Sequence, residues 1–334
     1  MTTQTKEAVD PIVDVIIPTC YPDRRFLETL ARLHRQSVRP RRIRVINTER
    51  EGFESLLREA GLSGEAFESN YPLAEIHHIR REEFDHGATR NAGALRCAGA
   101  DFLLFMTQDA LPEDRELVRN LLKPMERDPA GAVSYARQLP REGASAAERF
   151  TRLYNYPKQS SVKSQADYDR LGIKTYFCSN VCALYRKRTF DELGGFIRRT
   201  IFNEDMIYAG RALQDGWRIY YEAEARVVHS HHYSARQQFH RNFDLGVSQA
   251  DHPEIFAASS SESEGMKYVR TVIRYLRDQK AGREIPGFVA GCAARLLGYR
   301  LGKRYRTLPR AWVLRFTMNR NYWNGIGEGT EQSK

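Results

Sequence analysis

Three segments that lie far apart in the chain carry side chains able to bind a metal or exchange a proton. In the first, "FLLFMTQDALPED", Asp109 follows the apolar run from Phe102 to Met106. A continuous apolar run is typical of a strand buried in a parallel sheet, and open α/β sheets bind ligands beyond the carboxyl ends of such strands. Asp109 is therefore a candidate ligand for a metal or a sugar hydroxyl. A turn or helix-capping aspartate is the alternative.

The other two segments are acidic and histidine-rich. Glu204 and Asp205 follow Asn203 at the start of an expected helix, where one carboxylate could simply cap the helix and favour its positive end. His229 and His231 follow a β-rich run in "RVVHSHHYS". Period-two geometry puts these two rings on one face, as a metal site requires, although a polar surface would give the same pattern.

The elements that must position these residues alternate between strand and helix in the first half of the chain. Expected strands cover 13–19, 41–47, 73–79 and 102–106, and expected helices cover 26–36, 53–61, 89–99 and 116–127. Such alternation indicates a parallel sheet in an architecture of the nucleotide-binding type.

The second half of the chain has a less regular pattern. Residues 139–175 are polar, aromatic and turn-rich, which favours a lid or binding loop. Beyond them we expect a strand over 176–186, a helix over 204–217, and strands with an acidic turn between them within 218–234. The serine-rich stretch 259–265 reads as a linker.

Composition restricts the class of protein. Hydrophobic residues make up 41% and charged residues 28%, as in soluble globular proteins, and no segment approaches the roughly 18 apolar residues of a membrane span. The N-terminus lacks a basic region followed by an apolar one, so we expect a cytoplasmic protein without a secretory signal. Five irregularly spaced cysteines do not form a disulfide framework and are expected to be reduced.

The net charge of +10 is concentrated in the C-terminal region. Residues 266–320 alone carry a net +12, which leaves the rest of the chain slightly acidic. Two helices are expected there, and the second has an apolar stripe that includes Val289, Leu296 and Leu297. Basic amphipathic helices bind anionic membrane surfaces, but the pair could instead pack against the catalytic domain with solvated arginines. The two interpretations are compatible.

Six features of the sequence occur in one order: "VIIPT", "NTE", "HGATRNAG", "TQDA", "GGF" followed by "NED", and "VVHSH". In their order and spacing they resemble the inverting glycosyltransferases of family 2, over about residues 12–240. The resemblance implies an α/β fold of the GT-A type, in which helices cover both faces of a Rossmann-like, mostly parallel sheet, here with a basic helical extension. We place the transferase domain at 1–255 and the linker with the helical region at 256–334.

The resemblance also assigns donor-binding residues. The backbone around Pro18 and Thr19, together with Asn47, would line the nucleoside pocket, although relatives commonly have Asp in place of Asn47. Arg90 and Asn91 would lie near the diphosphate, since a guanidinium group suits phosphate oxygens and a helix start offers free N–H groups. For Arg90, an ordinary surface arginine is the alternative.

The segment "TQDA" stands where the family has its Asp-x-Asp motif, with Thr107 in the place of the first Asp. The resemblance leaves Gln108 and Asp109 as donor contacts, with Asp109 also a metal ligand. His229 and His231 would join it in a site for Mg²⁺ or Mn²⁺, to which the substrate diphosphate adds oxygens.

In the same family the acidic pair lies on the acceptor side. Asp205 would take the proton from an acceptor hydroxyl as that hydroxyl attacks the anomeric carbon, and Glu204 would assist or orient it. A single displacement of this kind inverts the anomeric configuration.

"FDHGATRN", "FMTQDALP" and "HSHHYS" resemble bacterial rhamnosyltransferases more than processive synthases, whose Gln-x-x-Arg-Trp signature is absent. The resemblance implies transfer of one sugar, L-rhamnose from dTDP-L-rhamnose, to a lipid-linked saccharide in cell-surface polysaccharide (O-antigen) synthesis. The protein would then be peripheral on the cytoplasmic face of the inner membrane. Another nucleotide sugar, such as a UDP-hexose or a galactofuranose donor, is the alternative.

Two functions of other classes compete with this interpretation. A basic protein with a pI near 9.4 could bind nucleic acid, but no groove-reading or stacking motif stands out, so we expect no nucleic-acid partner. A nucleotide-sugar-binding protein or nucleotidyltransferase without glycosyl transfer would leave the role of Asp205 unexplained.

Overall fold

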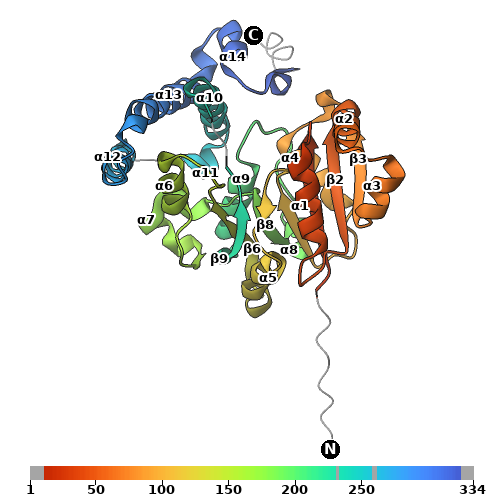
Figure 1. Cartoon of the computed structure of the whole chain (residues 1–334). Helices are drawn as coiled ribbons and strands as arrows, with labels where there is room; N and C mark the ends of the chain where they lie inside the picture. The colour runs from red at the N-terminus through yellow and green to blue at the C-terminus, as the bar shows by residue number, and fades with distance from the viewer. Residues whose placement is uncertain (1–10, 231–232, 258–261, 325–334) are drawn as a thin grey trace, which may run out of the picture.

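The computed structural model describes residues 11–230, 233–257 and 262–324. Its centre is a nine-stranded sheet in the order β3-β2-β1-β4-β8-β6-β9-β5, with β7 paired to β9 (Figure 1). The strands are β1 Val13–Cys20, β2 Arg42–Thr48, β3 Ala74–Ile79, β4 Phe102–Met106, β5 Leu111–Pro112, β6 Gly131–Leu139, β7 Ser161–Lys163, β8 Cys182–Arg186 and β9 Arg218–Val228.

β1 and β4 are continuous hydrophobic runs because both faces of each strand are buried. Phe102, Leu104 and Met106 of β4 face one core, whereas Leu103 and Phe105 face the other, so both faces of the strand are buried. Strands β3, β2, β1 and β4 are parallel, as the alternating pattern predicted. Their carboxyl ends therefore meet at one edge of the sheet.

Helices cover both faces of the sheet, which agrees with the expected α/β class. Residues of α1 Arg24–His34, α2 Arg50–Ala60, α3 Gly64–Asn70 and α5 Leu117–Arg127 belong to one core. Residues of α4 His86–Leu95, α8 Lys187–Glu192, α9 Glu204–Gln214 and α11 Pro253–Phe256 belong to the other.

Beyond β4 the sheet is mixed. β8 is antiparallel to β4 and β6 is antiparallel to β8, while β6 and β9 run parallel. The strand expected over 176–186 was too long, because a 3-10 turn covers Gly172–Tyr176 and only Cys182–Arg186 joins the sheet. Between this turn and β8, the backbone N–H of Asn180 donates a hydrogen bond to the Asp205 carboxylate instead of to a neighbouring strand.

The two strands expected within 218–234 are a single strand. β9 continues through the acidic segment, and its register against β6 shifts between Glu222 and Arg226. Ala223 and Ala225 are buried, whereas Glu224 is exposed. The acidic residues therefore lie on the outer face of a bulged strand, and the predicted turn was wrong.

The segment 139–175 is more regular than its sequence suggested. It contains α6 Ala146–Asn155 and the short helix α7 Tyr168–Leu171. Ser145 caps α6 by accepting a hydrogen bond from the N–H of Glu148, and the Glu284 carboxylate accepts from the N–H groups of Ala146 and Ala147. One partner of this N-terminus thus lies far away in sequence, where local pattern could not reveal it.

The C-terminal region is helical, as predicted, with α10 Ala235–Asp251, α12 Glu262–Asp278, α13 Ile285–Lys303 and α14 Arg310–Phe316. The linker expected at 259–265 lies in part outside the described residues, and its remainder belongs to α12. α10 and α13 lie side by side above the sheet (Figure 1). α10 precedes and α13 follows residue 255, so the two helices pack across the domain boundary that we predicted there. That boundary stays a prediction.

Glycines allow α10 and α13 to approach each other closely. A Cβ atom at Gly298 would lie 2.2 Å from the backbone oxygen of Phe239, and one at Gly246 would lie 2.4 Å from that of Tyr299. The predicted apolar stripe of α13 is only partly buried: Phe288 and Leu301 pack in hydrophobic clusters, whereas three other members are exposed. Val289, Leu296 and Leu297 are 42%, 45% and 55% exposed.

Among the described residues, none of the helices combines the length and apolar character needed to cross a membrane.

Candidate functional site

The structure brings Asp109 and His229 together at the edge of the sheet. β5, directly after Asp109, pairs with the end of β9, directly before His229, through Leu111 and Val228. The Oδ2 atom of Asp109 and the Nε2 atom of His229 are 3.4 Å apart, and the His229 side chain is 8% exposed. Residues 120 positions apart in sequence thus meet because a two-residue strand aligns their turns.

Gln138 of β6 orients the His229 ring. The His229 Nδ1 atom lies 3.0 Å from the Gln138 Oε1 atom, and Gln138 uses its Nε2 group to donate to Ser179. An amide oxygen can only accept, so the Nδ1–H of His229 donates to it, and Nε2 is the ring nitrogen that faces Asp109. Nε2 is therefore the nitrogen placed to bind a metal beside Asp109.

No cluster of three or more His, Cys, Asp or Glu side chains with metal-binding geometry occurs in the described part of the chain. The Asp109 carboxylate and the His229 imidazole nevertheless offer an oxygen and a nitrogen donor side by side. They fit a hard divalent cation that takes its other ligands from substrate and water. His231, the third predicted ligand, lies outside the described residues.

Asp205 lies at the N-terminus of α9. Its Oδ2 atom accepts a hydrogen bond of 3.0 Å from the N–H of Asn180, and its Oδ1 atom accepts one of 2.8 Å from the N–H of Met206. Asn203 precedes the helix with φ +64°, and its amide donates to Ser248 of α10. The turn that presents Asp205 is therefore anchored to the C-terminal helices.

Glu204 forms a buried ion pair with Arg90. The Arg90 Nη1 atom is 3.2 Å from the Glu204 Oε1 atom, and each side chain is 7% exposed. The amide of Asn180 donates to the same carboxylate oxygen. The predicted donor residue Arg90 is thus in contact with the acidic pair, where it is not a surface arginine.

The two adjacent carboxylates have different pKa shifts. Burial and then the charge of Glu204 raise the pKa of Asp205 to about 7. Burial also favours the neutral form of Glu204, but Arg90, His86 and Asn180 outweigh it and lower the pKa of that carboxyl. Glu204 therefore stays ionised, while Asp205 can exchange a proton near neutral pH.

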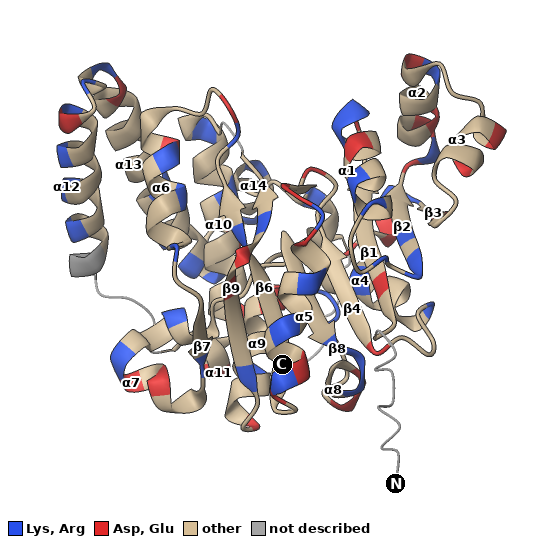
Figure 2. Cartoon of the chain, turned by 60° about the horizontal axis from the view of Figure 1, so that its bottom comes forward, with Lys and Arg blue, Asp and Glu red and all other residues tan. Residues whose placement is uncertain are grey.

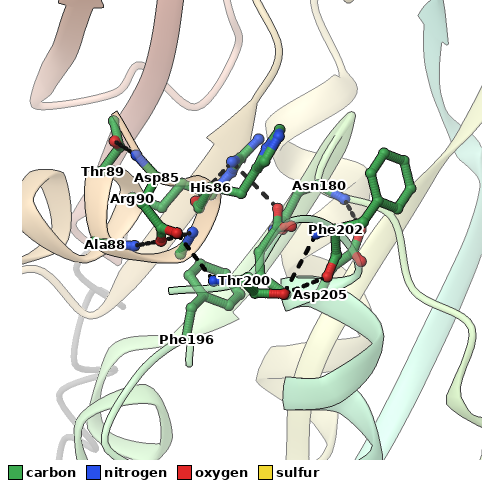
Figure 3. A network of polar contacts seen from close by, with 12 residues as sticks. Asp85, His86, Ala88, Thr89, Arg90, Asn180, Phe196, Thr200, Phe202 and Asp205 are labelled. Atoms are coloured by element: carbon green, nitrogen blue, oxygen red, sulfur yellow. Dashed lines mark hydrogen bonds and ion pairs between the residues drawn. The ribbon is translucent and has the colours of Figure 1, made fainter. Parts of the chain in front are cut away.

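The segment "HGATRNAG" forms α4 and ties the acidic pair to the loop after "GGF" (Figure 3). Asp85 caps α4 through the N–H groups of Gly87 and Ala88 and also accepts from Thr200. Gly87 is required because a Cβ atom there would lie 1.9 Å from the backbone oxygen of Ile197.

Asn91, the other predicted residue of α4, is occupied with backbone. Its amide donates to the Phe196 carbonyl over 2.7 Å, and its side-chain oxygen accepts from the Phe196 N–H over 2.9 Å. Asn91 therefore holds the loop between α8 and α9 against α4. A contact with the diphosphate stays a prediction.

The predicted nucleoside residues lie at the adjoining ends of β1 and β2, but their side chains are buried. Thr19 donates to the Asn47 Oδ1 atom over 2.9 Å, and Asn47 donates to the Glu49 carbonyl over 3.0 Å. Thr19 is 2% and Asn47 0% exposed. These two buried side chains therefore hold the ends of β1 and β2 together through hydrogen bonds.

Neighbouring residues at the same edge are more accessible. Gln108 bridges the ends of β4 and β1 by bonding both the N–H and the carbonyl of Cys20, next to the half-buried Pro18. Tyr21 is 53% exposed at φ +47°, and the Arg81 guanidinium lies 5.9 Å from its ring centre. A non-glycine residue in that conformation is a feature of functional sites, but φ is not readable from sequence.

A cavity of about 960 Å³ opens beside Asp205 and His229. Gln138, Asn203 and Met206 line it near these two residues, and faces of α6, α10 and α13 form its other walls. Sequence reasoning did not identify Gln138 or Asn180 as site residues. Neither lies in a distinctive motif, and each acts through a contact with a residue remote in sequence.

Comparison with known proteins gives concordant results. The glycosyl transferase family 2 model matches residues 14–194. The chain is 36% identical to the O-antigen chain rhamnosyltransferase RfbN of Salmonella typhimurium (strain LT2), over 94% of this chain and 96% of that protein. It is 40% identical to the O-antigen chain rhamnosyltransferase WbaN of Salmonella anatum, over 74% of this chain and 78% of that protein.

Among solved structures, the fold is similar to that of the mannosyltransferase PcManGT from Pyrobaculum calidifontis, determined in complex with GDP-Man and Mn²⁺. The TM-score is 0.55 at 17% identity, and the match covers 86% of this chain and 88% of that one. The similarity confirms the expected α/β fold of the GT-A type.

Proposed function

The chain belongs to glycosyltransferase family 2, and from this premise we propose that it transfers one L-rhamnose from dTDP-L-rhamnose to a lipid-linked saccharide with inversion at the anomeric carbon. The names of two relatives that match most of the chain, both rhamnosyltransferases of O-antigen chains, support the sugar and the pathway. The observation that carries the chemistry is the Asp205 carboxylate, which lines a large cavity beside the Asp109 and His229 pair.

Asp205 is the proposed general base. An acceptor hydroxyl oxygen attacks the anomeric carbon, the bond from that carbon to the diphosphate oxygen breaks, and the hydroxyl proton passes to Asp205. A carboxyl whose pKa is about 7 suits this step, because it is ionised at neutral pH yet basic enough to hold the proton. Arg90 keeps the neighbouring Glu204 ionised through their ion pair.

Asp109 and His229 would hold a divalent cation, Mg²⁺ or Mn²⁺. When bound, such an ion neutralises charge on a leaving diphosphate. Asp109 would supply a carboxylate oxygen, and Gln138 holds Nδ1 of His229 so that Nε2 points toward Asp109. The donor nucleoside would lie against the ends of β1 and β2, where Gln108 and Tyr21 border the site.

The acceptor and the cellular location are also proposed. The exposed apolar residues of α13, together with the basic surface of the C-terminal helices, favour a protein peripheral on the cytoplasmic face of the inner membrane. Lys and Arg recur along α12 (Figure 2). A saccharide linked to a membrane lipid would be presented at such a surface.

A thermal-shift screen of nucleotide sugars with and without Mn²⁺ tests the donor. A ligand that binds the native state raises its melting temperature, so dTDP-L-rhamnose should give the largest metal-dependent shift. Asp109→Ala should reduce the part of the shift that depends on Mn²⁺. A larger shift with a UDP-hexose would replace the donor, and an unchanged Mn²⁺ effect in Asp109→Ala would contradict the metal assignment.

A further inference from the structure

The cavity is lined by Asp205 and the proposed metal ligand His229, and also by residues of the C-terminal helices. None of the proposed donor residues Pro18, Thr19, Asn47, Arg90, Asn91, Gln108 and Asp109 lines it. Its far walls come from one face each of three helices: α6 contributes Thr151 and Arg152, α10 contributes Arg241 and Leu245, and α13 contributes Phe288 and Arg295. The cavity therefore lies on the acceptor side of the proposed base.

Arg241 is the most distinctive group on this wall. Its guanidinium carbon lies 4.5 Å from the ring centre of Phe202 and 5.7 Å from that of Tyr233. Phe202 is three residues before Asp205, so these rings fix Arg241 close to the reaction centre. Within the described residues Arg241 forms no ion pair with a carboxylate, and its planar set of N–H donors matches phosphate oxygens.

Arg295 approaches from α13 and is held by a neutral group. Its Nε atom donates to the Gln238 Oε1 atom over 3.1 Å, which leaves the terminal N–H groups for a ligand. The carboxylate of Glu284 is occupied by the N–H groups of Ala146 and Ala147. Glu148 also lines the cavity, from α6.

The wall continues into an apolar surface. Phe288 faces the cavity, whereas Val289, Leu296 and Leu297 of the same helix are exposed to solvent. A ligand with an anionic group at the arginines and an apolar chain beyond it would match both parts of α13. A neutral saccharide would match neither the arginines nor the exposed stripe.

We propose that Arg241 and Arg295 bind the diphosphate of a prenyl diphosphate-linked acceptor, with its saccharide directed toward Asp205 and its prenyl chain along α13. This inference rests on the proposed function and adds to it the residues that would hold the acceptor. The C-terminal helices are then part of the substrate site and decide which acceptor is used.

Calorimetric titration of the full chain with geranyl diphosphate tests the proposal. EDTA removes divalent metal, and saturating dTDP blocks the donor site. We expect wild-type protein to bind, and Arg241→Gln or Arg295→Gln to weaken binding by about tenfold or more, as the loss of charge-assisted hydrogen bonds predicts. Arg236→Gln is the matched control, because it removes the same charge from an exposed position of α10 outside the cavity.

Two further probes separate the parts of the ligand. Inorganic pyrophosphate should bind more weakly than geranyl diphosphate and should lose affinity in the same two variants, whereas geraniol should bind wild type and Arg241→Gln alike. Equal affinity for pyrophosphate and geranyl diphosphate would overturn the prenyl contact with α13.

The diphosphate site is overturned if wild type binds neither diphosphate, or if Arg241→Gln and Arg295→Gln bind as wild type does. It is also overturned if Asp109→Ala weakens binding as much as Arg241→Gln, since the probe would then occupy the donor site. Stabilisation by dTDP-L-rhamnose is measured on the same protein preparations with Mn²⁺ added and without EDTA or dTDP. If it persists while diphosphate binding fails, only the acceptor site is wrong, whereas its own absence counts against the proposed function.

Discussion

At the scale of the residue, ionisation of Asp205 should control turnover. Burial and the charge of Glu204 hold the pKa of Asp205 near 7, far above the usual value for an aspartate. A raised pKa means that the carboxyl is protonated and inactive as a base below about pH 7, and ionised above it. Burial and the charge of Glu204 should therefore make the rate depend on pH in the neutral range.

Turnover with saturating donor and acceptor should consequently rise with pH through about 7. Asp205→Asn should lower kcat by roughly 10²-fold or more, the usual scale for loss of a general base, because the amide cannot accept the proton. Steady-state kinetics across pH 5–9 would measure both effects, and donor titration should show retained affinity. A kcat in Asp205→Asn within a few-fold of wild type would remove Asp205 from the mechanism.

Glu204→Gln should shift the acid limb of the same pH profile to lower pH. The substitution removes a negative charge that raises the pKa of Asp205, and it leaves the positive charge of Arg90 to lower that pKa further. Glu224→Gln, an exposed change of the same kind on β9, is the matched control and should leave the limb in place. A shift of the limb to higher pH in Glu204→Gln would contradict the electrostatic account.

At the scale of the element, glycines decide how α10 and α13 meet. Gly246, Gly298 and Gly302 let the two backbones approach, so that the helix faces lining the cavity converge. Val289, Leu296 and Leu297 of the apolar stripe predicted for α13 are left exposed. The contact between α10 and α13 therefore buries the glycines and leaves these three larger side chains exposed.

Gly298→Ala should lower the free energy of unfolding by about 1–3 kcal/mol, because the new methyl group meets the backbone of Phe239 and the core is overpacked. Gly291→Ala, in the same helix with open space at its Cβ, should instead raise it by about 0.5–1 kcal/mol through helix propensity. Urea denaturation measures both changes. The packing account fails if the two variants change stability equally.

At the scale of the whole molecule, positive charge and exposed apolar residues occur on the C-terminal helices, whereas the proposed catalytic and metal-binding residues lie at strand ends and at the start of α9. Residues 266–320 hold the net positive charge, and Val289, Leu296, Leu297 and Trp312 are exposed nearby in sequence. In such a molecule the C-terminal helices can bind a membrane surface while the reaction takes place at the ends of the strands. The deeply buried contact of Phe243 with the terminal helices also makes this region part of the core.

Leu297→Glu should lower binding to vesicles of anionic phospholipid by about tenfold, since it removes an apolar contact and adds repulsion from the lipid headgroups. Leu95→Glu is the control, because Leu95 is 78% exposed on α4, outside the C-terminal helices. Vesicle sedimentation measures both. This design avoids deleting the tail, which would expose the buried face of α10. Equal binding of the two variants would exclude the α13 surface as the docking site.

Part of this organisation could be predicted from sequence because it is local. The parallel strands β1 to β4 and their helices follow from apolar runs and helical spacing, which depend on near neighbours in the chain. The acidic pair was placed at a helix start for the same reason. β7, the bulge in β9 and helix α6 were missed or misread, because their partners lie 56 to 138 residues away.

By itself the sequence determined which residue types were available at the strand ends and helix starts, and therefore which chemistry the chain could perform. Only the tertiary structure decided which of them meet. It paired Arg90 with Glu204, buried Thr19 and Asn47 beneath the strand ends, and set His229 against Asp109 through a two-residue strand. It also turned Gly298 and Gly302 of α13 toward α10. The reason is physical: side-chain pattern fixes local conformation, whereas contacts across the fold depend on how all the elements pack together.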